Sequence, residues 1–182
     1  MTRPAMKSVA ATIATLALVL AAAPAYAAPK TKRVIDDPVE PGKAYDIVKV
    51  VVKSQKTKAG VARVTVTHGR DVKTGDTVDF WLNIDADAQP DIHVVGDSFS
   101  EYTVFQTDSF LEDGKDISNR GCAALKMEGK KSKLTFDPKC LKAGETFRVS
   151  VKSSRSHMAS STNDFAPGAE KFTKKVLSGP LS

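Results

Sequence analysis

The longest regular alternation of apolar and polar positions lies near the middle of the chain. Val78, Phe80, Leu82 and Ile84 are apolar, and the positions between them are occupied by Asp79, Trp81 and Asn83. A period of two over this length is typical of a β-strand with one buried face. The sequence therefore predicts a central strand over residues 77–84, which runs into an acidic turn.

Shorter alternations of the same period surround this strand. They predict further strands at residues 48–53, 62–67, 92–95, 99–107, 122–127, 131–137 and 147–152. Turn-forming residues separate these segments, and no stretch has the pattern of an amphipathic helix. The expected fold class is all-β: a single antiparallel β-sandwich, jelly-roll or Ig-like, of about eight strands. Several strand orders fit the same pattern.

The two ends of the chain differ in composition from this middle part. Residues 1–27 contain basic residues, a long apolar run and a small-x-small site, and so predict a signal peptide and a secreted, extracellular protein. Residues 28–45 are rich in proline and charge, which predicts a flexible leader. The β-sandwich domain is then expected over 46–176 and a tail over 177–182. No apolar run in the mature chain reaches the length of a membrane span.

Two cysteines, Cys122 and Cys140, flank the hairpin predicted over residues 122–137. An even number of cysteines in an exported chain predicts a disulfide bond. The bond would clamp the open end of the hairpin and stabilise the domain by roughly 3 kcal/mol.

The charge is mildly basic, with a net value of +6 for the whole chain. Lysine and arginine are scattered along the predicted strands, which favours a solvated surface and not a nucleic-acid partner. An alternative function is a structural or protein-interaction module of the cell surface. It would use a sheet edge or a basic outer face, for which the candidates are Lys126, Lys133, Arg148 and Lys152.

The acidic turn presents Asp85, Asp87 and Asp91 within seven residues. Calcium accepts several carboxylates from one irregular loop, so these residues are the candidate metal ligands. An EF-hand is excluded, because Pro90 occupies the position where that loop needs glycine. The alternative is that the aspartates close Asx turns without any ion.

Trp81 is the only tryptophan, and it points outward if Phe80 and Leu82 point inward. An exposed aromatic ring on a β-sandwich is a common sugar-binding surface, so Trp81, together with Tyr102, is the candidate ligand-binding pair. The alternative is that the tail covers Trp81, with Phe165 or Phe172 as the covering ring.

No catalytic motif is present, and the expected protein is not an enzyme. The histidines have none of the spacings typical of zinc sites; they are His68, His93 and His157. A hydrolase with a carboxylate pair drawn from Glu101, Asp108 and Glu112 is retained as an alternative, because such pairs have no linear signature.

Three short motifs carry a resemblance, at residues 46–50, 80–87 and 164–167. With the late cysteine pair, they resemble a group of small uncharacterised secreted β-sandwich proteins of high-GC Gram-positive bacteria. More loosely, the chain is similar to family-9 carbohydrate-binding and DOMON-type sandwiches. That likeness implies a sugar ligand at Trp81, or haem held by Met127, Met158 or a histidine. The expected function is a secreted, non-catalytic binding module for cell-wall or extracellular glycan.

Overall fold

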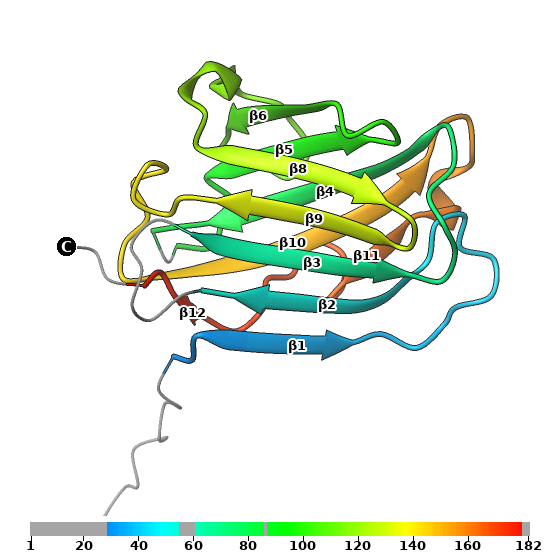
Figure 1. Ribbon diagram of the computed structural model, residues 1–182, viewed down its shortest axis with the longest axis horizontal. Coiled ribbons are helices and arrows are strands. Elements are labelled where there is room, and N and C mark those ends of the chain that lie inside the picture. The colour runs from blue at the N-terminus through cyan, green and yellow to red at the C-terminus, as the bar shows by residue number, and fades with distance from the viewer. Residues whose placement is uncertain (1–28, 55–60, 86, 180–182) are drawn as a thin grey trace, which may run out of the picture.

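The computed structural model describes residues 29–54, 61–85 and 87–179. The expected signal peptide lies outside the described residues. Two antiparallel sheets pack face to face (Figure 1), as predicted from the period-two alternation. None of the helices in the described part has the length and hydropathy needed to cross a membrane.

The sheet nearer the viewer in Figure 1 has five strands. In spatial order they are β1 (Lys32–Asp36), β2 (Ile47–Lys53), β3 (Ala62–His68), β9 (Lys131–Phe136) and β8 (Ala123–Glu128). The β2–β3 and β8–β9 pairs are hairpins, and β3 joins β9 between them. β-branched residues dominate β2 and β3, which suits a pleated, half-buried surface.

The second sheet has seven strands. Its main path runs β11 (Asp164–Ala166), β10 (Thr146–Arg155), β4 (Asp76–Asn83), β5 (Ile92–Asp97), β6 (Tyr102–Gln106) and β7 (Lys115–Asp116). β12 (Val176–Leu177) also pairs with β10. Two single 3₁₀ turns, Ser118–Arg120 and Ser160–Thr162, lie in the connections. β4 and β10 are the long central strands.

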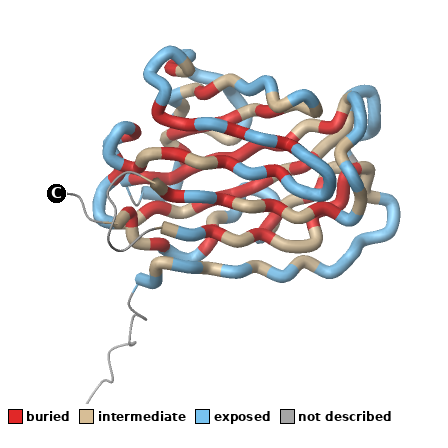
Figure 2. The backbone as a smooth tube through the Cα atoms, in the orientation of Figure 1, coloured by how far each residue is buried: buried red, intermediate tan, exposed pale blue. Residues whose placement is uncertain are grey.

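The core lies between the sheets, and the longer strands contribute alternate side chains to it (Figure 2). Fully buried members include Val50, Val52, Val64, Val66, Phe80, Leu82, Leu134, Val149 and Val151. Burial of each such side chain stabilises the fold by about 1.5–3 kcal/mol. Phe136 and Phe147 meet edge to face across the two sheets, with ring centroids 5.2 Å apart.

The disulfide bond between Cys122 and Cys140 is present, with the two Cα atoms 5.5 Å apart. Cys122 precedes β8 and Cys140 follows β9, so the bond closes the open end of this hairpin. The prediction of both the pairing and its place is confirmed.

The segment expected to be a flexible leader is partly a strand. Residues 32–36 form β1, which pairs with β2 in register from Lys32↔Lys53 to Asp36↔Lys49. Ile35 packs against the core, and Tyr45 at the end of the segment is fully buried. Prolines and charges at both ends of this short strand hide its alternation in the sequence. The expected tail likewise begins inside β12.

Candidate functional site

The outer face of the seven-stranded sheet holds Trp81, which points away from the core but is only 4% exposed. The indole stacks on the His93 imidazole, with ring centroids 4.5 Å apart and planes 7° apart. Phe110 covers another part of the ring at 5.5 Å, and Phe172 packs on Phe110 at 5.1 Å. The prediction of an exposed aromatic platform at Trp81 is therefore wrong. The alternative of a covered ring is confirmed, but the covering ring is Phe110 from the loop before β7, and Phe172 of the tail packs on Phe110.

The covering segments are tied down by backbone hydrogen bonds. The Thr173 N–H donates to Val149 O (2.8 Å), and the Val149 N–H donates to the Thr173 hydroxyl (3.2 Å). The loop over residues 107–114 is anchored by the Thr107 N–H, which donates to Asp91 O (2.9 Å), and its two ends are joined by the Thr107 hydroxyl, which donates to Glu112 O (2.8 Å). The guanidinium of Arg148 lies over the Phe172 ring at 5.1 Å. Both segments are thus integral parts of the folded sheet.

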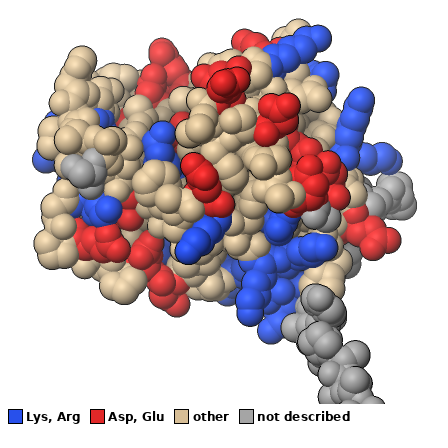
Figure 3. All heavy atoms as spheres, turned by 180° about the vertical axis from the view of Figure 1, so that it is seen from behind, with Lys and Arg blue, Asp and Glu red and all other residues tan. Residues whose placement is uncertain are grey.

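Charged groups around Trp81 are paired with one another. His93 lies between two carboxylates, with Nε2 3.1 Å from Asp79 Oδ1 and Nδ1 2.8 Å from Asp113 Oδ1. Lys152 lies over the Trp81 ring at 5.5 Å and pairs with Asp79 at 3.0 Å. Figure 3 shows acidic and basic side chains interspersed over this face. Pairing and cover together make it a closed, structural surface.

Tyr102 does not join Trp81. It lies opposite Gly96 in the β5–β6 pair, on the side that faces the other sheet, and its hydroxyl donates to Ala123 O at the edge of β8 (3.0 Å). The Ser100 hydroxyl bonds to Met127 on the same strand. The pairing of Tyr102 with Trp81 in one binding surface is therefore wrong, whereas a ligand-binding role for the half-exposed Tyr102 ring alone stays a prediction.

The acidic turn after β4 uses its carboxylates to bind backbone N–H groups. Asp85 accepts from Asp87 N (3.0 Å), Asp87 accepts from Gln89 N (2.7 Å), and Asp91 accepts from Ile84 N (2.7 Å). The first two are the Asx-type contacts of the alternative interpretation, and the third closes the turn from its far end. Among the described residues, no group of three or more His, Cys, Asp or Glu side chains is arranged to hold a metal ion. The prediction of a calcium site at Asp85, Asp87 and Asp91 is thus not supported.

Asp91 has an unusual environment. Burial raises the pKa of its carboxyl, and the nearby charges of Asp85 and Asp87 raise it further, although the Ile84 N–H acts in the opposite direction. Asp85 and Asp91 line a hollow of about 230 Å³ together with Arg120 and Lys142. Since Asp91 is held by the backbone, it serves to fix the turn.

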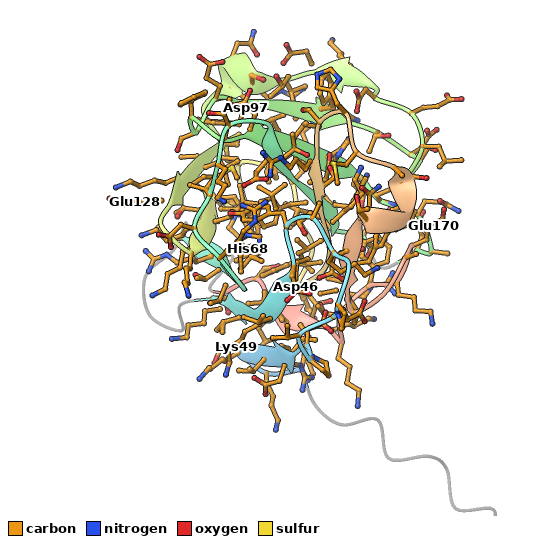
Figure 4. All side chains as sticks on the ribbon, turned by 90° about the vertical axis from the view of Figure 1, so that its right-hand side faces the viewer. Asp46, Lys49, His68, Asp97, Glu128 and Glu170 are labelled. Carbon is orange, nitrogen blue, oxygen red and sulfur yellow. A yellow bond between two sulfur atoms is a disulfide. The ribbon has the colours of Figure 1, made fainter. Side chains whose placement is uncertain are left out.

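His68 lies inside the sandwich at one end, as Figure 4 shows. It stacks on Tyr45 at 3.7 Å, and its Nε2 is 2.9 Å from the Ser132 hydroxyl. Burial lowers the pKa of His68 to about 3. His68 therefore belongs to the interior packing.

Asp37 lies in the loop that follows β1. Burial, and then the charge of Asp164, raise the pKa of its carboxyl to about 6.

The outer face of the five-stranded sheet is different: no segment of the described chain lies over it (Figure 1). Its outward positions carry seven cations and two carboxylates, Asp36 and Glu128. We call this surface the cationic face. Its cations are Lys32, Lys49, Lys53, Arg63, Lys126, Lys131 and Lys133.

The strand register places like charges directly opposite each other on the cationic face. Lys53 is opposite both Lys32 and Arg63, in one row across three strands. Lys126 is opposite Lys133 in the β8–β9 hairpin. Like charges in such cross-strand pairs are destabilising. These pairs therefore repel each other, whereas opposite charges at the same positions would attract.

Only two ion pairs offset this charge among the described residues. Lys49 pairs with Asp36 at 2.7 Å, and Lys126 pairs with Glu128 at 2.6 Å. Lys126, and more weakly Lys133, lowers the pKa of the exposed Glu128 carboxyl. The row of Lys32, Lys53 and Arg63 has no ion-pair partner in the described chain.

A groove of about 280 Å³ lies within the cationic face. Its lining is four cations, one hydroxyl and one carboxylate: Arg63, Lys126, Lys131, Lys133, Thr65 and Glu128. Guanidinium and ammonium groups supply charge-assisted hydrogen bonds to carboxylate, sulfate or phosphate oxygens. This groove is the candidate functional site.

The basic surface proposed from the sequence is divided between two faces. Lys126 and Lys133 lie on the cationic face, whereas Arg148 and Lys152 lie on the covered face and bind Asn83 and Asp79 there. Arg63 is not among the site residues predicted from the sequence. The signal that finds it is the register of β3 with β2 and β9, which alternation alone does not give.

No protein-family model, curated protein or solved structure matches this chain. The resemblances to secreted, carbohydrate-binding and DOMON-type sandwiches therefore stay predictions from short motifs.

Proposed function

We propose that this chain is an exported, non-catalytic binding module that holds an acidic glycan on its cationic face. The observation that carries the proposal is the unpaired row of Lys32, Lys53 and Arg63, together with the adjacent groove. A bound polyanion would convert the cross-strand repulsion into attraction, because each cation would gain an oppositely charged neighbour.

The chemistry of the face favours a glycan over a nucleic acid. Sites for single-stranded nucleic acid combine cations with aromatic rings on which bases stack. The outward positions of the cationic face carry only Lys, Arg, Thr, Val, Ala, Asp and Glu. Thr65 and Arg63 in the groove suit the hydroxyl and acid groups of an acidic sugar chain. The disulfide bond is consistent with an oxidising compartment, as expected for an exported protein.

The test is retention on immobilised dextran sulfate, with plain dextran as the neutral matrix. The double variant Arg63→Glu/Lys133→Glu should reduce affinity at least tenfold, because two cations of the groove become anions. A tenfold loss corresponds to about 1.4 kcal/mol of binding free energy.

The matched control is Lys115→Glu/Lys139→Glu, which makes the same change in net charge at two exposed positions outside the cationic face. This control should keep most of the affinity. Equal losses in the two double variants would show a response to overall charge alone and would reject a site on the cationic face. Strong retention on plain dextran would reject the acidic ligand.

A further inference from the structure

Strand β1 forms one edge of the five-stranded sheet and pairs with β2 on its other side. The Ser54 N–H donates to Thr31 O (2.9 Å), and the Asp37 N–H donates to Val48 O (3.1 Å). Residues that exchange backbone bonds with an antiparallel neighbour alternate along a strand. The odd-numbered residues from 31 to 37 therefore direct their backbone groups toward β2.

The even-numbered residues of the same strand direct their backbone groups outward. At Lys30 this open side is occupied, because the Leu177 N–H donates to Lys30 O (3.1 Å). At Lys32, Val34 and Asp36, no strand of the described chain pairs with the open side. The open edge is thus a stretch of five residues, bounded by the tail at one end and by the end of β1 at the other.

This open edge is complementary to itself. In an antiparallel pair of two β1 strands centred on Val34, Lys32 of each copy would face Asp36 of the other, and the two Val34 side chains would meet. Val34 is 43% exposed, which is high for a valine in a strand. All three residues project on the outer side of the sheet. We propose that two copies of this chain pair through β1 and so form one continuous sheet.

The proposed pairing satisfies the exposed backbone. Lys32, Val34 and Asp36 of the two copies would exchange on the order of six hydrogen bonds, since each directly opposite pair of this kind exchanges two. Two Lys–Asp contacts would flank the valine pair and fix the register. The contact area is small, so the dimer forms and dissociates readily and is best detected by covalent capture.

The twofold axis of such a pair is perpendicular to the sheet, so both cationic faces would lie on the same side of the dimer. A long polyanion would then contact two grooves at once, and the second contact would be intramolecular. This consequence rests on the proposed function, whereas the pairing itself does not.

The test is disulfide capture with Val34→Cys. Both native cysteines are already bonded, so the new thiol would be the only free one. Cα atoms in a hydrogen-bonded antiparallel pair are about 5.5 Å apart, within the range that a disulfide spans. The control is Ala124→Cys, at an exposed position on the opposite edge strand β8. Oxidation of the purified proteins should give disulfide-linked dimers at least five times faster for Val34→Cys.

Charge variants in the Val34→Cys background test the register. Lys32→Glu places two acids opposite each other and should slow capture at least threefold. Adding Asp36→Lys exchanges the two charges and should restore most of the rate. Equal rates for the two cysteine variants, or a rate that ignores the charge reversal and its exchange, would overturn the proposal. No glycan is present in this test, so its outcome is independent of the retention experiment.

Discussion

The two outer faces of this sandwich are both built from antiparallel strands, but one is covered and its charges are paired, whereas the other is exposed and carries unpaired cations. On the seven-stranded sheet, Trp81 and His93 are stacked, their charged neighbours are paired, and two segments close over them. On the five-stranded sheet, the outward side chains are exposed, and cations such as Lys53 and Arg63 face one another without counter-charges. The covered face stabilises the fold, whereas the open face retains unfavourable repulsion.

The comparison shows that an unusual residue in a strand can serve either the packing of the fold or a binding surface. The single tryptophan is conspicuous in the sequence, but His93, Phe110 and Lys152 pack against its ring. The lysines and arginines of the other sheet look ordinary in the sequence, and become unusual only when the register places them in rows. A charge arrangement that costs stability and remains accessible is the better indicator of a binding surface here.

The largest expected effect of a substitution lies on the covered face. Trp81→Ala should reduce the free energy of unfolding by about 3–5 kcal/mol, because it leaves a cavity beneath Phe110 and removes the stack on His93. Urea denaturation measures this loss. Thr65→Ala, at an outward position of the cationic face, is the matched control and should change stability by less than about 0.5 kcal/mol. A small loss for Trp81→Ala would contradict the structural role of the covered face.

Acidification should weaken the interior while leaving the open face able to bind. In the unfolded chain His68 has its ordinary pKa of about 6.5, whereas burial lowers the pKa to about 3 in the folded chain. The unfolded chain therefore binds this proton at a higher pH than the folded chain does. Stability is therefore lost progressively as pH falls through this window, by about 2–3 kcal/mol at pH 4.5 relative to pH 7.5. Urea denaturation at the two pH values measures the loss, and His68→Gln should flatten it. An equally steep loss in His68→Gln would assign the effect to other groups.

Retention on dextran sulfate at the same two pH values shows whether binding by the cationic face depends on pH in the same way as stability does. Lysine and arginine side chains ordinarily titrate far above this range, so retention should persist at pH 4.5 while the protein is still folded. Loss of retention in step with the loss of stability would instead tie binding to the interior.

A smaller effect of opposite sign is expected at Asp37. Its pKa is raised to about 6, so the folded chain takes up this proton before the unfolded chain as pH falls from about 6 to 3.8. The carboxylate therefore destabilises the fold at neutral pH, and acidification removes the penalty. Asp37→Asn should stabilise the protein at pH 7.5 by on the order of 1 kcal/mol after solvent screening, and by less at pH 4.5. Urea denaturation at both pH values checks the sign; a destabilised variant at pH 7.5 would contradict it.

The smallest expected stability effect lies on the cationic face itself. Arg63→Thr should leave stability unchanged or raise it by a few tenths of a kcal/mol, because it removes the cation opposite Lys53 and introduces a residue that favours strands. The same variant should weaken retention on dextran sulfate. Thermal unfolding and retention measured together show whether stability and binding oppose each other at this position. A destabilised variant with unchanged retention would make Arg63 a structural residue.

Much of the fold could be predicted from alternation and the cysteine pair. The strands predicted at 48–53, 62–67 and 131–137 agree with β2, β3 and β9 to within one residue at each end, because each has a clear apolar face. Cys122 and Cys140 flank a hairpin that the same pattern defines. These features depend on local sequence, and local sequence was sufficient.

The site could not be predicted in the same way, because its features depend on contacts between distant segments. Trp81 is covered by Phe110, on which Phe172 of the tail packs in turn, and no local pattern connects these three residues. β1 lies in a charged, proline-rich segment with few apolar residues. Its strand conformation depends on pairing with β2, which the local sequence does not show. The cationic rows likewise require the register between strands. Of the four basic residues predicted from the sequence, only Lys126 and Lys133 lie on the open face.

The most direct test of the central claim is an NMR titration of the protein with short dextran sulfate oligosaccharides. Binding on the cationic face predicts shift changes concentrated in β3, β8 and β9, at Arg63, Thr65, Lys131 and Lys133, with little change at the Trp81 indole N–H. Shift changes concentrated at Trp81, His93 and Phe172, with the five-stranded sheet unaffected, would contradict it and place the ligand beneath a displaced tail.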